Sequence, residues 1–205
     1  MPRIFVINKF EVNHYGGLEV DTTSHGNNKD LSPFHLGPVP TYEPGVMATC
    51  VENLWQYSKV YRAHVFVPAN PIDLFNPMAW EPSDLYYRWR DDGWARSRAE
   101  RYPMGKGAKP LYSLWKGQKL DYVQARKIIY VPAYANAVIK TRSYAMLYEA
   151  LQNGTDVVLR DFDGYDYTKT GRTLVDVINN PSKTMGHAFV LAMLLTGTLE
   201  VCISS

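Results

Sequence analysis

The stretch between residues 49 and 61 reads TCVENLWQYSKVY and carries the clearest helix-start signal in the chain. Thr49 and Glu52 fit the S/T-x-x-E capping box, in which a hydroxyl and a carboxylate accept hydrogen bonds from the first amides of a helix. Apolar residues continue at helical spacing after this pair. The pattern predicts a helix from about Thr49 to Arg62.

One face of this predicted helix gathers several polar groups. Glu52, Gln56 and Lys59 lie at i, i+4 and i+7, so they share a face, and Trp55 lies beside them. A carboxylate, an amide, an ammonium and an indole on one stripe could form a compact polar site. The competing interpretation is purely structural, with Glu52 serving only the capping box and Lys59 only extending its ammonium to solvent.

The rest of the chain predicts an α+β fold, a predominantly α-helical single domain over residues 1–205 with a small β-sheet. Short apolar runs predict the strands, at 4–7, 18–22, 65–67 and 157–159. Helical periodicity and capping signals predict further helices, at 83–89, 121–130, 143–152, 173–178 and 184–195. Residues 68–120 are rich in Pro, Trp and charge, which predicts an insert or long loop region within the domain.

Composition limits the class of protein. Hydrophobic residues make up 46% of the 205 residues and charged residues 20%, which is an ordinary globular balance. The longest apolar run, 188–195, is too short to span a bilayer, so no membrane partner is expected. Cys50 and Cys202 lie far apart, which predicts a reduced protein of the cytoplasm, or of the host cytoplasm if the protein is viral. The five histidines form no metal-binding motif, so neither a metal nor a cofactor is expected.

Charge is distributed unevenly along the chain. The stretch from Arg88 to Lys127 holds 11 of the 22 Lys and Arg residues with only four acids, a balance of +7, and aromatic residues alternate with these bases. Bases bind phosphate and aromatic rings stack on nucleobases, so the stretch predicts a ligand that carries phosphate, either a nucleotide or a nucleic acid. The expected phosphate ligands are Arg96, Arg98, Arg101 and Lys106. The alternative is a solvated surface whose tryptophans anchor a long loop.

Three motifs resemble the NADAR family, the NAD- and ADP-ribose-associated domain. Residues 31–39, LSPFHLGPV, are similar to its L-S-N-F-x-x-x-P-[VI] opening, and residues 51–59 to its E-H-x-[FW]-Q-x-x-K helix. Residues 185–193, MGHAFVLAM, resemble its closing N-x-L-G-x-x-L-M helix, and residues 125–134 are similar to a phage-associated branch. The chain departs from the family where Asn53 replaces the motif's His, where a Trp-Gly pair is missing, and in the long insert.

The resemblance implies an N-glycosidase, a hydrolase that acts on an ADP-ribosylated guanine or a related ribosylated nucleotide or nucleic acid. Glu52 would stabilise the oxocarbenium-like transition state and activate water. Lys59 would hold phosphate or sugar hydroxyls, or attack the anomeric carbon. The implied substrate-binding residues are Trp55, Gln56, Asp163, Phe34 and Gly186. Two other classes stay open: a non-catalytic nucleotide, ADP-ribose or nucleic-acid binding protein of the same fold, and a viral structural or interaction protein.

Overall fold

The structure is a computed structural model that describes residues 2–205, and it divides into two compact units. The first unit comprises Met1–Leu36 and Val131–Ser205, and the second comprises Gly37–Tyr130. Helices predominate and the sheets are small, so the α+β class is confirmed. This division does not test whether residues 1–205 form one domain, so that expectation stays a prediction.

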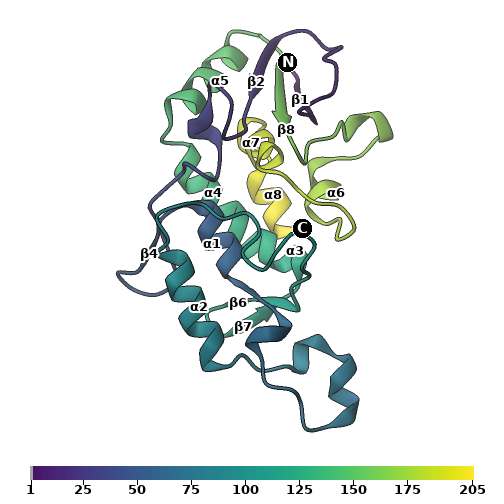
Figure 1. Cartoon of the computed structure of the whole chain (residues 1–205). Helices are drawn as coiled ribbons and strands as arrows, with labels where there is room; N and C mark the ends of the chain where they lie inside the picture. The colour runs from purple at the N-terminus through teal and green to yellow at the C-terminus, as the bar shows by residue number, and fades with distance from the viewer. Residues whose placement is uncertain (1) are drawn as a thin grey trace. The chain divides into compact units, whose positions relative to one another are not determined.

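The first unit is built on a three-stranded parallel sheet in the order β1-β8-β2 (Figure 1). The strands are β1 (Ile4–Asn8), β2 (Leu18–Asp21) and β8 (Val157–Asp161). The central strand β8 is fully buried from Val157 to Leu159, as expected for a strand that pairs on both edges and is covered by helices. All three strands lie where the apolar runs predict them.

Helices complete the first unit. They are α4 (Val131–Val138), α5 (Arg142–Gln152), α6 (Leu174–Ile178), α7 (His187–Leu195) and α8 (Leu199–Ser204). Helix α7 packs against β1 and β8 and is buried through its first seven residues (Figure 1). It begins three residues later than predicted, because Gly186 is its N-cap.

The second unit pairs helices with two small antiparallel sheets. The helices are α1 (Val51–Tyr57), α2 (Asp84–Trp94), α3 (Tyr122–Ala125) and the π-helical turn η5 (Arg126–Tyr130). The strands are β3 (Val39–Pro40) with β4 (Met47–Ala48), and β5 (Lys59–Val60), β6 (Tyr112–Trp115) and β7 (Gln118–Leu120) in that order. Between Val65 and Val67, where a strand was expected, only one bridge forms, from Val65 to Pro82.

Helices α1 and α2 are in close contact at Gly93. A Cβ atom at this position would lie 1.8 Å from a ring carbon of Tyr57, so only glycine fits. The close approach fixes α1 against α2 and thereby positions the side chains that α1 carries.

Candidate functional site

Helix α1 begins at Val51, two residues later than the sequence predicts. Cys50 is the N-cap, and its Sγ accepts a hydrogen bond from the backbone amide of Asn53 at 3.5 Å. The side chain of Thr49 instead donates to the carbonyl oxygen of Trp94 at 3.1 Å. The predicted capping box is therefore wrong, and Glu52 does not hold the role that the structural interpretation gave it.

Helix α1 also ends earlier than predicted, at Tyr57 rather than near Arg62. Ser58 closes the helix, because its hydroxyl donates to the carbonyl oxygen of Leu54 at 2.7 Å. Lys59 therefore lies in strand β5, where it pairs with Ser113 of β6. The expectation that Lys59 shares a helical face with Glu52 is wrong, and a different contact joins the two.

The amide of Gln56 joins Glu52 to Lys59. Its Nε2 donates to Oε1 of Glu52 at 2.8 Å, and its Oε1 accepts from Nζ of Lys59 at 2.7 Å. We call this series of hydrogen bonds the Glu52–Gln56–Lys59 chain. It fixes the orientation of the Gln56 amide, since Nε2 must face the carboxylate and Oε1 the ammonium.

Burial sets the chemistry of these three hydrogen-bonded side chains. Glu52 is 5% exposed and Gln56 8% exposed, and Nζ of Lys59 lies 4.6 Å from the ring centroid of Trp55. Desolvation lowers the pKa of Lys59 to about 8, although the nearby charge of Glu52 acts in the opposite direction. Part of the Lys59 population is therefore a neutral amine near physiological pH.

Three further residues lie at this site that the sequence analysis did not single out. The ring of Trp55 is 6.3 Å from that of Tyr122 and 5.2 Å from that of Tyr130, centroid to centroid. The guanidinium of Arg126 stacks on Tyr122 at 3.9 Å. These three residues of α3 and η5 are spaced four apart, which was the available signal that they share a face.

Asn53 connects α1 to the basic stretch, which is the segment from Arg88 to Lys127. Its side-chain Nδ2 donates to the carbonyl oxygens of Arg96 and Arg98, each at 3.1 Å, and its Oδ1 accepts from the amide of Glu100 at 3.0 Å. Tyr57 adds a hydrogen bond from its hydroxyl to the carboxylate of Glu100. Asn53 thus holds the loop from Arg96 to Glu100 in place.

The basic stretch is less available to ligands than its composition suggests. Arg90 is buried and forms ion pairs with Glu43 and Asp91, and Lys119 pairs with Glu81. Other members have aromatic or acidic neighbours: Arg96 pairs with Glu100 at 3.0 Å, and Arg101 lies over Tyr102. Arg98 and Lys106 are exposed.

Most of the aromatic residues in this stretch are structural. Trp94 and Tyr112 are buried, and Trp89 packs on Tyr57 and His64. These rings pack inside the unit, as expected if the tryptophans anchor a long loop. The two that keep a large exposed area are Tyr102 and Tyr122.

The remaining predicted site residues belong to the first unit. Phe34 is half-buried just after a short 3-10 helix, and Asp163 accepts a hydrogen bond from the hydroxyl of Thr184 at 3.0 Å. A Cβ at Gly186 would lie 2.1 Å from the carboxylate of Asp161, so the fold itself requires glycine there. Their part in substrate binding stays a prediction.

Within residues 2–205, no group of three or more His, Cys, Asp or Glu side chains is arranged to hold an ion. Over the same residues, no helix has both the length and the apolar content required to cross a bilayer.

Comparison with known proteins gives no family assignment. No family model matches the chain, and searches of the curated proteins and of the solved structures found no match either. The resemblance to the NADAR family therefore stays a prediction.

Proposed function

We propose that this chain is an N-glycosidase that acts on an ADP-ribosylated guanine or a related ribosylated nucleotide or nucleic acid. The observation that carries the proposal is the Glu52–Gln56–Lys59 chain, in which Glu52 and Gln56 are buried and Lys59 is half-buried. It places a carboxylate and an amine of lowered pKa on one amide. Buried ionisable groups with perturbed pKa values cluster at functional sites.

The proposed reaction breaks the bond between the anomeric carbon and the base nitrogen, and the bonding electrons leave with the base. Positive charge then grows on the sugar, where the carboxylate of Glu52 stabilises it. A water molecule adds to the anomeric carbon and gives a proton to Glu52, which returns it to the departing base. Gln56 holds the carboxylate in one orientation throughout.

Lys59 has two roles open to it in this scheme. In its charged form the ammonium binds phosphate or sugar hydroxyls beside the face of Trp55. In its neutral form, about a tenth of the population at pH 7 for a pKa of about 8, the amine can attack the anomeric carbon as the base leaves with the bonding electrons. The proton that the amine then loses passes to the base, and water hydrolyses the lysine adduct to release the sugar.

Glu52→Gln tests the proposal. The variant should fold normally and lose release of ADP-ribose from ADP-ribosylated guanosine nucleotides or DNA, measured by mass spectrometry. Glu149→Gln, which removes an exposed acid of α5, should keep full activity. Full activity in Glu52→Gln would remove Glu52 from the mechanism, and an inactive wild-type chain would end the glycosidase proposal.

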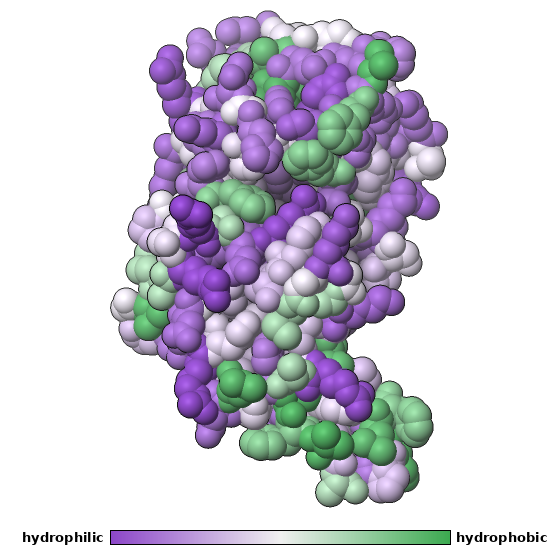
Figure 2. Space-filling model, in the orientation of Figure 1, coloured by the Kyte–Doolittle hydropathy of each residue, from purple (hydrophilic) through white to green (hydrophobic). Residues whose placement is uncertain are grey.

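An interaction protein is the second candidate, favoured by one surface feature. Apolar side chains gather on the exposed segment that follows β5 (Figure 2): Phe66, Val67, Ile72, Leu74, Phe75 and Met78. Phe75 is 89% exposed, and contiguous apolar surface of this kind often marks a binding site. For an interaction protein, Phe75→Asp would abolish association and Glu52→Gln would not. A non-catalytic binding protein of the same fold would bind ADP-ribose without turnover.

A further inference from the structure

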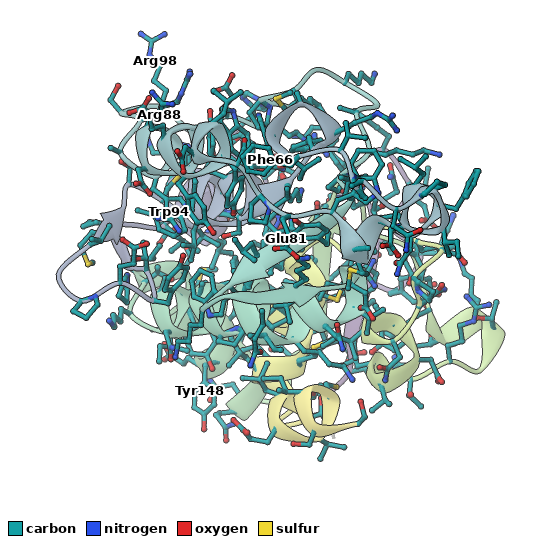
Figure 3. The ribbon with its side chains drawn as sticks, turned by 90° about the horizontal axis from the view of Figure 1, so that it is seen from below. Phe66, Glu81, Arg88, Trp94, Arg98 and Tyr148 are labelled. Atoms are coloured by element: carbon teal, nitrogen blue, oxygen red, sulfur yellow. The ribbon has the colours of Figure 1, made fainter. Side chains whose placement is uncertain are left out.

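The loop between α2 and β6, residues 95–111, carries an excess of positive charge. We call it the basic loop. It contains five bases and one acid: Arg96, Arg98, Arg101, Lys106, Lys109 and Glu100. Within residues 2–205, Arg98, Lys106 and Lys109 form no ion pair, and neither does Arg88 on α2, the helix that leads into the loop. Figure 3 shows Arg88 and Arg98 extending away from the ribbon.

The basic loop is held in a defined shape although it contains no regular secondary structure. The three hydrogen bonds of Asn53 fix its first part to α1, from Arg96 to Glu100. Gly105 and Gly107, both at φ 90, make the turns of its second part. A loop that is ordered before binding pays less conformational entropy when a ligand arrives.

An exposed ring lies among these charges. Tyr102 is 47% exposed, and the guanidinium of Arg101 lies 5.3 Å from its ring centroid. An aromatic face in solvent can stack on a nucleobase only where that base is unpaired, whereas a duplex keeps its bases stacked inside.

We infer that the basic loop binds the phosphodiester backbone of a single-stranded nucleic acid, with Tyr102 stacking on one base. Four cations without ion pairs, spread over α2 and the loop, suit phosphates that repeat along a strand better than the single diphosphate of a free nucleotide. The inference deepens the proposed function, on which it rests for the identity of the substrate, because it makes the ribosylated base part of a strand. Binding needs no turnover, so the two proposals fail separately.

Fluorescence anisotropy with a labelled oligothymidylate of about 20 nucleotides, titrated over a range of salt concentrations, measures this binding. A single strand loses affinity with a slope of about −0.7 in log K against log[salt] per neutralised phosphate, so four cations predict a slope of about −3. Arg98→Ala with Lys106→Ala should reduce its magnitude by about 1.4. Tyr102→Ala should weaken binding about five-fold or more at every salt concentration.

Matched controls separate this surface from general charge. Lys29→Ala with Lys140→Ala removes two exposed bases outside the basic loop, and Tyr148→Ala removes an exposed tyrosine of α5, so both should bind as the wild type does. The inference is overturned by no binding at low salt, by tighter binding of the duplex, by full competition from free ADP-ribose, or by equal losses in the controls.

Discussion

Replacing Lys59 by methionine should stabilise the fold at neutral pH. Burial lowers the pKa of Lys59 from 10.5 to about 8, and each pKa unit corresponds to about 1.4 kcal/mol, so keeping this amine charged in the folded state costs about 3 kcal/mol. Methionine removes that cost but leaves Oε1 of Gln56 without its donor, a loss of about 1 kcal/mol. The net gain in the free energy of unfolding is about 2 kcal/mol at pH 7.

The pH dependence of this difference makes the prediction specific. Between pH 8 and 10.5 the unfolded chain binds more protons at Lys59 than the folded chain does, so the wild type gains stability as the pH rises through that window. Lys59→Met lacks this gain, so its advantage should vanish near pH 10 and become a small disadvantage by about pH 10.5, where only the lost hydrogen bond to Gln56 remains. Groups that do not interact with Lys59 titrate equally in both proteins and cancel in the comparison.

Urea unfolding of both proteins at pH 7, 8, 9 and 10, followed by circular dichroism, measures the difference. Lys106→Met is the control, because that side chain is exposed and its replacement should change stability little at any pH. Destabilisation of Lys59→Met at pH 7, or an advantage that stays constant up to pH 10, would refute the argument that a buried, desolvated amine is maintained here at the expense of stability.

Two further substitutions test other parts of the second unit. Asn53→Ala should free the basic loop from α1, so the amide of Glu100 should exchange hydrogen faster by mass spectrometry while α5 keeps its protection; unchanged exchange would show that other contacts hold the loop. Burial lowers the pKa of His64, so the wild type should lose stability as the pH falls below about 6.5, where the unfolded chain takes up the proton. His64→Leu should show a flatter acid limb in thermal unfolding, and an identical limb would contradict the buried neutral state.

The sequence predicts the first unit well because its signals are local. Strands β1, β2 and β8 are short apolar runs bounded by polar residues, and α5 and α6 have threonine N-caps. Helix α4 was missed because Pro132 lies at its start, and proline carries a large helix penalty in an interior position. Helix α8 was also missed, because Gly197 after α7 indicates the end of a helix and not the start of another.

The β6–β7 hairpin of the second unit was missed for a different reason. Its turn is Lys116–Gly117, with φ 51 and 76, and non-glycine residues seldom adopt a positive φ. The usual signal for such a turn is Asn-Gly or Asp-Gly. Strands of three or four residues are too short to show a clear alternation of apolar and polar residues, and this turn lacks the usual sequence signal.

The geometry of the candidate site follows the sequence pattern only in part. Helical spacing put Glu52 and Gln56 together, as the structure has them. Lys59 reaches Gln56 from a strand instead, because its side chain is long enough to point back along α1. The contacts of Asn53 and Arg126 depend on how distant segments pack, which no local pattern records.

The order of strands in the first unit affects how the protein is made. Strand β8 lies between β1 and β2, yet it is translated last, about 150 residues after β1. At about 5–20 residues per second, a ribosome takes on the order of 10–30 s to cover that interval. During that time the first two strands lack the neighbour that satisfies their backbone amides, so their edges are open to pairing with other nascent chains.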